Sequence, residues 1–462
     1  MSLELFNTLT RKKSPFRPLE AGQVKLYTCG PTVYDTAHIG NMRTFIFEDL
    51  LRRYLTYAGY KVLHVMNITD VDDKTIERAI REDRDLQELT GHYTESFIAD
   101  LATLNILPAQ HLPRATEFVA EMAAGIETLV QKGHAYATPD GSVFFDISSF
   151  DGYGQLVNLQ PDQQRAGERT AEDDYGKDQA ADFALWKAHK PSDGPYQWPS
   201  PWGPGRPGWH MECSIMSTHF LGPHFDIHCG GVDNIFPHHE NEIAQSRCLF
   251  GTPFVETWLH SEHLIVDGEK MSKSRGNFYT LADILDRGYS AAAVRYTLLT
   301  THYRQQLNFT FAKVAESQKA LNRLRELARR LEQASDGAGG EEVPAPDAEL
   351  RAALDNDLNI AGALGAIFGW AKELFGRLDG QTLGPAGARA ALEALRRYDE
   401  ILGCIFVNEA AGDAAAIEAL LKERNAARSA GDWARADAIR DELAGQGIIL
   451  EDGAEGTVWK RG

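Results

Sequence analysis

The spacing of apolar residues in the amino-terminal part of the chain predicts alternating strands and helices. Residues 24–29 form a short apolar run that ends at Gly30, which is typical of a buried strand. Apolar residues then recur every three to four positions between 45 and 58, which predicts a helix, and 61–68 is a second strand-like run. A strand, a helix and a second strand in succession predict a parallel sheet. We therefore expect an α/β fold class with a Rossmann-like parallel-sheet domain.

The middle of the chain interrupts this alternation. The pattern predicts helices over 72–104 and 114–132, and a hairpin turn at 139–141. Residues 133–208 are first polar and acidic and then crowded with Pro, Gly and Trp, so we interpret them as an insertion in the α/β domain. The segment 224–228, HFDIH, predicts that the sheet resumes there.

The carboxyl-terminal third has a helical pattern. From Phe311 onward Leu and Ala recur at helical spacing, and the segment 336–347, rich in Gly, Glu and Pro, predicts a linker followed by two more helices. A further helical stretch over 414–443 precedes two short strand-like runs. We expect an α-helical bundle followed by a small α+β module, and these changes of pattern divide the chain into domains at 1–310, 311–410 and 411–462.

The composition is that of a soluble globular protein. The chain has 462 residues, a length typical of about three domains, and it is 43% hydrophobic and 24% charged. It lacks both an apolar run of the ~18–20 residues that cross a membrane and a signal-peptide core, so we expect a cytoplasmic protein with no membrane partner. Five cysteines are few and odd in number, which argues against a disulfide framework and for a reducing compartment.

The charge balance bears on nucleic-acid partners. The net charge is −19, from 47 Lys and Arg against 66 Asp and Glu. An acidic surface disfavours non-specific binding of nucleic acid, because the attraction to phosphates requires positive charge. A specific nucleic-acid partner that docks on a local basic face remains compatible with this balance.

Two segments have the composition of a phosphate site. Segment 31–41, PTVYDTAHIGN, follows the first predicted strand and opens the next helix, where unpaired N–H groups attract anions. There His38 can donate to a phosphate oxygen, and Gly40 permits close approach of a ligand. Segment 269–277, EKMSKSRGN, is a cationic loop that suits the charge developing on transferring phosphates. Each segment alone is weak evidence, since a short basic run is usually a solvated loop, and the sequence has neither a G-x-G-x-x-G nor a P-loop motif.

Four residues have the chemistry of a zinc site, although they lie far apart in the sequence. A helix predicted from Pro237 carries His238 and Glu242 four positions apart, on one face. Cys213 follows the insertion and Cys29 ends the first strand, so that two thiolates, an imidazole and a carboxylate could hold a tetrahedral Zn²⁺. The spacing is not that of a zinc finger, and an isolated buried cysteine is more often a packing residue. Rival ligands therefore stay open: His228, Cys229, His239 and Glu240.

The two phosphate segments together resemble the signature motifs of class I aminoacyl-tRNA synthetases. HIGN follows the first strand and KMSKS comes some 230 residues later. Four longer runs, TCGPTVYDTAHIGN, GWHMECS, GGVDNIFPHHENEIAQS and EKMSKSRGN, are similar to the cysteinyl-tRNA synthetase family, and the resemblance extends over nearly the whole chain. The chain departs from the family motif at Asn41, where the motif has His, which leaves the role of this position open.

The resemblance implies a class I cysteine–tRNA ligase that acts as a monomer. Its partners would be L-cysteine, ATP with Mg²⁺, and tRNA(Cys). The cysteine carboxylate would attack the α-phosphate of ATP, and the cysteinyl group would then move to the terminal ribose of the tRNA. Residues 258–310 would hold the KMSKS loop and the region that contacts the tRNA stem.

The resemblance also implies a role for individual residues. One Zn²⁺ per chain would be held by Cys29, Cys213, His238 and Glu242. The catalytic residues would be His38, Lys270 and Lys273. ATP would contact His38, Gly40, Asn41, Asp233 and Lys273. The substrate cysteine would contact Gly30, Thr32, Thr69 and Trp209. The tRNA anticodon would contact Arg428, Trp433, Asp437 and Arg440.

Zinc has a physical role in such an enzyme. Cysteine and serine differ only by sulfur for oxygen, and apolar packing discriminates such small changes only ~10–200-fold. A thiolate-bound zinc ion prefers a thiolate to a neutral alcohol and favours the deprotonated thiol. We therefore expect zinc to select the substrate and not to activate a water molecule.

Two alternatives belong to other classes of protein, and a third is another kind of ligase. A zinc hydrolase could use Glu240 or Glu242 as its base, but its chemistry would leave the KMSKS loop without a role. A non-catalytic nucleic-acid-binding protein with structural zinc fits poorly with the net charge of −19. A ligase that joins cysteine to a small amine would resemble the synthetase without its distal module, which this chain has. Pyrophosphate exchange separates ligase from hydrolase, and charging of tRNA separates the two ligases.

Overall fold

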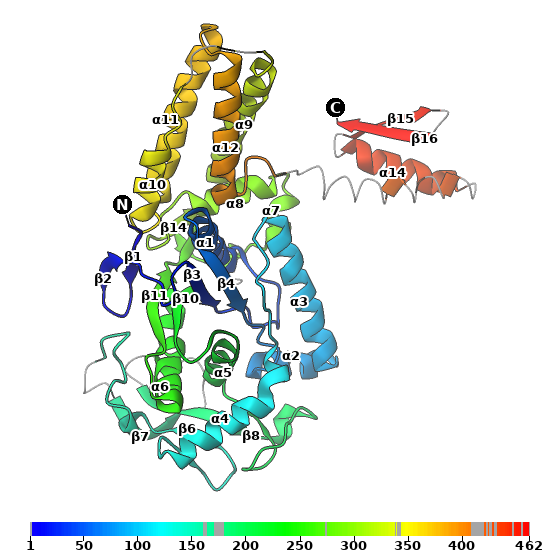
Figure 1. Ribbon diagram of the computed structural model, residues 1–462. Coiled ribbons are helices and arrows are strands. Elements are labelled where there is room, and N and C mark those ends of the chain that lie inside the picture. The colour runs from blue at the N-terminus through cyan, green and yellow to red at the C-terminus, as the bar shows by residue number, and fades with distance from the viewer. Residues whose placement is uncertain are drawn as a thin grey trace. The chain divides into compact units, whose positions relative to one another are not determined.

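The computed structural model divides the chain into two compact units, Met1–Ile405 and Phe406–Gly462 (Figure 1). Among the helices in the described part of the chain, none is both long and apolar enough to cross a bilayer. The structure describes residues 2–159, 164–170, 180–272, 275–337, 339, 343–407, 420–421, 424, 427–428, 432–445, 448–453 and 456–461.

The centre of the large unit is a four-stranded sheet in which every strand runs parallel to its neighbours. The order is β11 (Val255–Ser261), β10 (Phe225–Gly231), β3 (Gln23–Thr28) and β4 (Lys61–Met66). Helix α1 (Ile39–Tyr57) connects β3 to β4 and packs on one face of the sheet. The prediction of an α/β fold with a parallel sheet is confirmed.

The order of the strands creates a crevice at one edge of this sheet. From β3 the chain crosses over to β4 on one side, whereas the much later β10 pairs with β3 on the other side. The two loops that leave β3 and β10 therefore diverge, and such a point at the carboxyl ends of parallel strands is where α/β folds bind ligands. The backbone N–H of Cys29 donates to the carbonyl of Cys229 at 3.3 Å, so these loops begin side by side.

The stretch 72–104, predicted to be helical, contains two helices. They are α2 (Asp73–Glu82) and α3 (Leu86–Thr103). Asp83 adopts a left-handed conformation with φ of 51° and ends α2, and the Asp85 carboxylate then accepts N–H bonds from the first turn of α3. The next helix, α4 (Val119–Gln131), follows a short 3-10 turn at Ala115–Phe118.

Residues between α4 and α5 build a second sheet. It contains β5 (Ala135–Ala137), β6 (Val143–Phe145), β7 (Gln164–Thr170), β8 (Ala180–Ala188) and β9 (Gly205–Pro207). Strands β5 and β6 form the predicted hairpin, and β8 lies in the middle of the sheet. Figure 1 shows this sheet at the end of the large unit opposite the helical bundle. Short 3-10 turns lie at Ile147–Ser149, Pro191–Asp193 and Val232–Ile235.

The remaining elements of the large unit surround the parallel sheet and lead to the bundle. Helices α5 (Trp209–Leu221) and α6 (His238–Phe250) pack against each other below the crevice. A small mixed sheet and two helices follow β11. These elements, with the amino-terminal hairpin, are β12 (Leu264–Val266), β13 (Glu269–Lys270), α7 (Leu281–Leu285), α8 (Ala291–Leu299), β14 (Leu307–Phe309), β1 (Glu4–Asn7) and β2 (Lys12–Pro15).

Three helices follow the linker in the bundle, not the two that were predicted. Helix α9 (Phe311–Ala334) packs against α11 (Ile360–Asp379) and α12 (Pro385–Leu402). The additional helix is α10 (Asp347–Asp355). It is separated from α11 because Asp357 and Leu358 both have positive φ, which a continuous helix cannot contain.

The carboxyl-terminal unit has the predicted helix and two strands. Helix α14 (Trp433–Gly445) precedes the antiparallel pair β15 (Ile448–Gly453) and β16 (Gly456–Arg461). Leu421, Ile439 and Leu443 form the buried cluster of this unit. Residues 414–419 of the predicted helical stretch lie outside the described residues.

A buried ion cluster joins α1 to α8 and to the end of α12. Arg295 and Arg53 both bond the Asp49 carboxylate, at 2.5 and 2.7 Å, and Arg295 also donates to the Leu402 carbonyl at 2.6 Å. Burial alone would raise the pKa of Asp49, but the two guanidinium groups outweigh it and hold that pKa below its usual value. Both guanidinium groups share the one carboxylate and also donate to backbone carbonyls, so this cluster fixes the bundle on the sheet domain.

Glu48, one residue earlier on α1, is buried without such partners. It is 1% exposed, and neither carboxylate oxygen has a hydrogen-bond partner. Burial raises the pKa of Glu48 well above its usual value. The folded protein therefore favours the protonated form of this carboxyl group.

The substitution Glu48→Gln removes this ionisable group and keeps the size of the side chain. Because the pKa is raised on folding, wild-type stability falls as the pH rises above the unfolded-state value of about 4.3, and the stability of the variant does not. We expect the advantage of the variant in free energy of unfolding to grow between pH 6 and pH 8, measured by urea denaturation.

The matched control is Glu316→Gln, at an exposed position on α9. It should follow the wild type at both pH values. A Glu48→Gln effect of the same size at pH 6 and pH 8 would contradict an origin in ionisation.

Candidate active site

Four buried donor groups converge below the end of β3. They belong to Cys29, His238, His239 and Glu242, and their ligand atoms lie within 4.8 Å of one another. Cys29 directly follows β3, and the other three occupy the first two turns of α6. The predicted spacing places His238 and Glu242 on one face of this helix, with Nε2 and Oε1 3.1 Å apart.

Cys213 joins this group from α5. Its side chain is 1% exposed, and its Sγ lies 4.0 Å from the Sγ of Cys29. Two sulfur atoms on one tetrahedral zinc ion, each at about 2.3 Å, would be about 3.8 Å apart. The spacing of the two thiols therefore matches shared coordination. Of the four residues that were expected to hold zinc, Cys29, His238 and Glu242 belong to the mutually close group, whose fourth member is His239, and Cys213 lies next to Cys29.

Two atoms that face each other in this group have no hydrogen bond. His238 Nε2 and Glu242 Oε1 are both buried, and neither has a hydrogen-bond partner. Burial lowers the pKa of His238 to about 3, so its ring is neutral at pH 7, the form that binds metals. A cation between nitrogen and oxygen would satisfy both atoms, and the donor set of sulfur, nitrogen and oxygen suits zinc. The residues present therefore fit a zinc ion.

The rival ligands left open by the sequence have different surroundings. Glu240 accepts backbone N–H bonds from Gly154, Leu156 and Val157, so it holds a loop and does not face the cluster. Cys229 packs in the core on the α1 side of the sheet. The Nε2 atom of His228 lies 3.0 Å from Oε2 of Glu242, and this hydrogen bond orients the carboxylate.

His239 is the rival that does reach the cluster. Its Nε2 lies 3.2 Å from Cys29 Sγ, and its Nδ1 lies 2.8 Å from His260 Nε2. His260 in turn contacts the Thr8 hydroxyl at 2.8 Å. Sequence analysis left the position of His239 open and missed His260, because residues on different strands and helices give no common spacing.

The residues expected to contact cysteine surround the same end of the sheet. The Trp209 ring stacks on the His238 ring, with centroids 3.9 Å apart. Thr32 and Thr69 pair as a β-bridge, and the Thr69 hydroxyl donates to Glu212 at 2.8 Å. Only glycine fits at position 30, since a Cβ there would lie 1.6 Å from the Asn67 carbonyl oxygen.

His38 and Asn41 cap the first helix reciprocally. The His38 N–H donates to Asn41 Oδ1 at 3.0 Å, and the Asn41 N–H donates to His38 Nδ1 at 3.2 Å. Because Nδ1 accepts, the proton of the neutral ring is on Nε2. Asn41 therefore has a structural role where the family motif has His. Its cap also explains why α1 begins at Ile39, before the apolar pattern that starts at residue 45.

Met271 and two residues that follow the KMSKS motif, Phe278 and Tyr279, lie against this helix terminus. The Ile39 N–H donates to the Tyr279 carbonyl at 2.9 Å, and the His38 and Phe278 rings are 5.1 Å apart. A Cβ on Gly40 would lie 3.0 Å from Met271 Cε, so glycine leaves space for the loop. Lys270 is exposed at the end of β13, whereas Lys273 lies outside the described residues.

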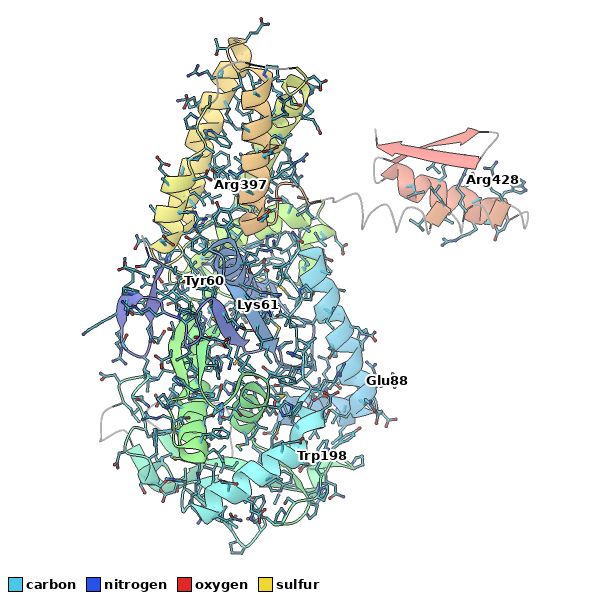
Figure 2. All side chains as sticks on the ribbon, in the orientation of Figure 1. Tyr60, Lys61, Glu88, Trp198, Arg397 and Arg428 are labelled. Atoms are coloured by element: carbon cyan, nitrogen blue, oxygen red, sulfur yellow. The ribbon has the colours of Figure 1, made fainter. Side chains whose placement is uncertain are left out.

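Two further groups complete the predicted set. Asp233 follows β10, and its Oδ1 is close enough to Gly231 that a Cβ there would lie 2.3 Å away. On the carboxyl-terminal unit, Trp433 is 62% exposed, which excludes a core position, and Asp437 pairs with Arg440 at 3.2 Å. Figure 2 labels Arg428, on the helical side of the same unit.

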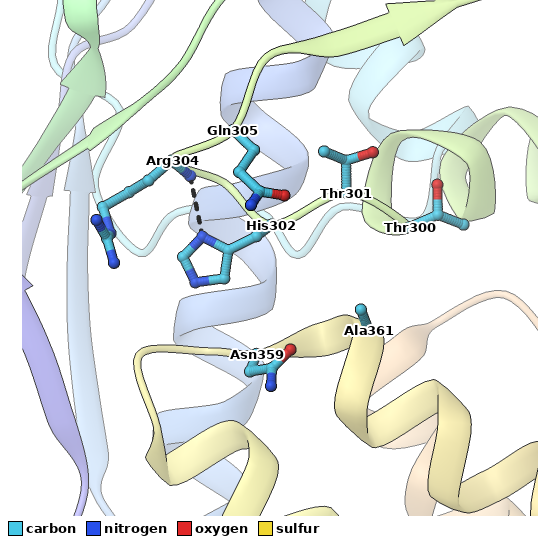
Figure 3. Close-up of a pocket in the computed structure, with 7 residues that line it drawn as sticks. All are labelled: Thr300, Thr301, His302, Arg304, Gln305, Asn359 and Ala361. Carbon is cyan, nitrogen blue, oxygen red and sulfur yellow. Dashed lines mark hydrogen bonds between the residues drawn. The ribbon is translucent and has the colours of Figure 1, made fainter.

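A polar cavity of about 440 Å³ lies elsewhere, between the loop after α8 and the start of α11 (Figure 3). His302 at its centre accepts from the Arg304 N–H at 3.2 Å and donates to the Asp357 carbonyl at 2.7 Å. Both ring nitrogens are thus engaged within the protein. The predicted site residues are not among those that line this cavity, which are Thr300, Thr301, His302, Arg304, Gln305, Asn359 and Ala361.

Family models match three consecutive parts of the chain. Residues 15–319 match the class I (C) tRNA synthetase catalytic domain, 349–406 the DALR domain, and 412–459 the cysteinyl-tRNA ligase anticodon-binding domain. The chain is 48% identical to a protein of Chlamydia muridarum, with 100% of both chains covered, and 46% identical to one of Brachyspira hyodysenteriae, with 99% of this chain and 98% of the relative covered. Both relatives are named Cysteine--tRNA ligase.

Solved structures agree on the fold. Methionyl-tRNA synthetase of Mycobacterium tuberculosis, bound by methionyl-adenylate, superposes with a TM-score of 0.60 at 16% identity, covering 86% of this chain and 94% of that chain. The leucyl enzyme of Agrobacterium radiobacter K84 in a ternary complex has the same TM-score at 13% identity, covering 86% of each chain. The match of the class I catalytic domain over more than half of the chain, together with full-length relatives at nearly half identity, establishes that this protein belongs to the cysteine–tRNA ligase family of class I aminoacyl-tRNA synthetases.

Proposed function

We propose that this protein activates L-cysteine with ATP and Mg²⁺ and transfers the cysteinyl group to tRNA(Cys). In the first step a carboxylate oxygen of cysteine bonds to the α-phosphorus of ATP and pyrophosphate leaves. In the second step a terminal ribose hydroxyl of the tRNA attacks the carbonyl carbon, loses its proton, and AMP leaves. The observation that carries this proposal is the group of buried thiol, imidazole and carboxylate donors next to the end of β3, the strand that the HIGN segment connects to α1.

The amino acid would be held at the buried end of the crevice. Cys29, Cys213, His238 and Glu242 would hold one zinc ion, whose chemistry when bound favours a substrate thiolate over the hydroxyl of serine. Around it, the pocket for cysteine would be lined by Gly30, Thr32, Thr69 and Trp209. Stacking of Trp209 on His238 supports this arrangement, because it fixes the imidazole and closes one side of the pocket.

The nucleotide would be held by the helix terminus and the loop. His38 would donate its Nε2 proton to a phosphate oxygen, since Nδ1 already accepts from the backbone. Lys270 and Lys273 would stabilise the charge on the departing pyrophosphate. Gly40 and Asn41 would shape this end of the site, and Asp233 would meet the adenosine. No protein nucleophile is required, so these residues act by positioning and by charge.

The carboxyl-terminal unit would contact the anticodon. The exposed Trp433 offers a stacking surface, and Arg428, Asp437 and Arg440 offer hydrogen-bonding groups, the combination that binds unpaired RNA bases. We propose domains at 1–310, with an inserted segment at 133–208 and the loop and stem-contact region at 258–310, then 311–410 and 411–462. The enzyme would act as a monomer in the cytoplasm.

The metal proposal is tested on cobalt-substituted protein. Adding L-cysteine should increase the sulfur-to-metal charge-transfer absorption, because a further thiolate enters the coordination sphere, whereas L-serine should not change it. Cys213→Ser should lose bound metal. The control Cys248→Ser, at a thiol on α6 that is not part of the donor group, should keep one metal ion per chain. An absorption spectrum that does not change when cysteine is added would rule out a role of zinc in selecting the substrate.

The loop is tested with Lys273→Ala. Loss of one charge-stabilising group should lower the rate of ATP–pyrophosphate exchange by ~10²-fold or more, with a much smaller change in cysteine binding. Lys319→Ala, an exposed lysine on α9, is the control and should leave exchange unchanged. Normal exchange in Lys273→Ala would rule out the proposed role of this lysine.

The anticodon unit is tested with Asp437→Ala. Charging of tRNA should fall on the order of tenfold or more, while pyrophosphate exchange stays at the wild-type rate. Arg435→Ala is the control, because helical spacing puts it on the face of α14 opposite Asp437. Equal loss of charging and exchange would mean that the helix is only structural. Normal charging of tRNA would mean that residues other than Asp437 recognise the anticodon.

A further inference from the structure

A buried chain of hydrogen bonds runs from the loop after β3 to helix α5. The Gly30 N–H donates to Asn67 Oδ1 at 2.9 Å, and Asn67 Nδ2 donates to Thr69 Oγ1 at 3.1 Å. The Thr69 hydroxyl in turn donates to Glu212 Oε2 at 2.8 Å. Asn67, Thr69 and Glu212 are each at most 1% exposed, so water does not compete for these bonds.

The first donor sets the direction of every bond in this chain. A backbone N–H can only donate, so the atom of Asn67 that faces Gly30 is its oxygen, and the nitrogen of the same amide faces Thr69. Because Thr69 Oγ1 accepts from this nitrogen, its own proton goes to Glu212. A hydroxyl group has one proton and two lone pairs, so these two bonds leave one lone pair of Thr69 Oγ1 for a further donor.

The loops after β3 and β4 are joined without the side chain of Asn67. The Val33 N–H donates to the Thr69 carbonyl and the Thr69 N–H donates to the Pro31 carbonyl, both at 3.1 Å. Neither of these bonds involves the Gly30 N–H or the Thr69 hydroxyl. The backbone bonds therefore attach the two loops to each other, and the Asn67 carboxamide fixes the direction of two groups that the attachment leaves out.

We propose that Asn67 is a positioning residue of the cysteine pocket, whose carboxamide orients the Gly30 backbone and the Thr69 hydroxyl for the substrate. The proposal rests on the pocket given under Proposed function, which both of these residues would line, and it adds a residue that does not itself touch the substrate. A hydroxyl held in one direction binds a substrate donor without the entropy cost of fixing its rotation. Asn67 therefore acts on the binding of cysteine and leaves the binding of ATP unchanged.

The proposal is tested by a double-mutant cycle on ATP–pyrophosphate exchange. Asn67→Ala should raise the KM for cysteine about tenfold or more, with the KM for ATP and the zinc content at their wild-type values. Thr69→Val, which removes the hydroxyl, should also raise the KM for cysteine, whereas Thr69→Ser, which keeps it, should not. In the double variant the rise should be smaller than the product of the two single effects, because Asn67 acts through the Thr69 hydroxyl.

The matched control is Asn7→Ala. Asn7 is also buried, at 7% exposed, and its carboxamide bridges backbone groups of β11: Nδ2 donates to the Glu256 carbonyl at 2.7 Å, and Oδ1 accepts from the Trp258 N–H at 3.2 Å. Both asparagine variants should melt at a lower temperature than the wild type, because each loses buried hydrogen bonds. The KM of Asn7→Ala for cysteine should be that of the wild type.

The outcomes separate the inference from the function on which it rests. An unchanged KM for cysteine in Asn67→Ala, equal rises for cysteine and ATP, or single effects that multiply in the double variant would overturn the role of Asn67 alone. Failure of Asn67→Ala to fold would also overturn it, because the backbone bonds would then be insufficient to join the loops. Loss of zinc from this variant would do the same, since Asn67 Oδ1 lies 3.7 Å from Cys213 Sγ and the effect would pass through that residue. A wild-type protein without cysteine-dependent exchange would overturn the proposed function itself.

Discussion

The structure depends on the pairing of β3 with β10 in the middle of the parallel sheet. These strands lie about 200 residues apart in the sequence, and their register sets Thr28 opposite Cys229, with a hydrogen bond from the Cys29 N–H to the Cys229 carbonyl. Since parallel strands end at one edge, the loops that follow both strands meet there. This pairing brings Cys29 to the first turns of α6.

Two buried polar clusters of the large unit are built on different principles. In the cluster around Asp49, the guanidinium groups of Arg53 and Arg295 share the carboxylate and donate to backbone carbonyls, so the cluster holds α1, α8 and the end of α12 together unaided. The donor group around His238 and Glu242 leaves inward-facing atoms without hydrogen bonds. A buried polar group without a partner is costly, so the second cluster has the character of a binding site, whereas the first has that of a structural joint.

The two halves of the crevice also differ in exposure. The donor group is almost completely buried, and every thiol in it has a pKa raised by burial, which suits selection of a small amino acid away from water. The helix terminus at His38 is partly accessible and Lys270 is exposed, which suits a large, charged nucleotide. The reciprocal cap between His38 and Asn41 connects these requirements, because a local hydrogen-bond pair fixes the direction in which the imidazole can donate.

Features that depend on short-range spacing could be predicted from the amino-acid sequence. The strand, helix and strand at the amino terminus, the hairpin at β5 and β6, and the shared face of His238 and Glu242 all follow from periodicity, and the family follows from its motifs. Breaks in helices were missed at Asp83 and Asp357, where a left-handed backbone conformation gives no apolar signal. Which of several adjacent donors face the cluster depends on how the elements pack in three dimensions. Successive residues of a helix point about 100° apart, so the docking of α6 against β3 and α5 turns His239 toward Cys29 and Glu240 toward a loop backbone. Neither composition nor spacing encodes that docking, because it results from the packing of side chains distant in the sequence.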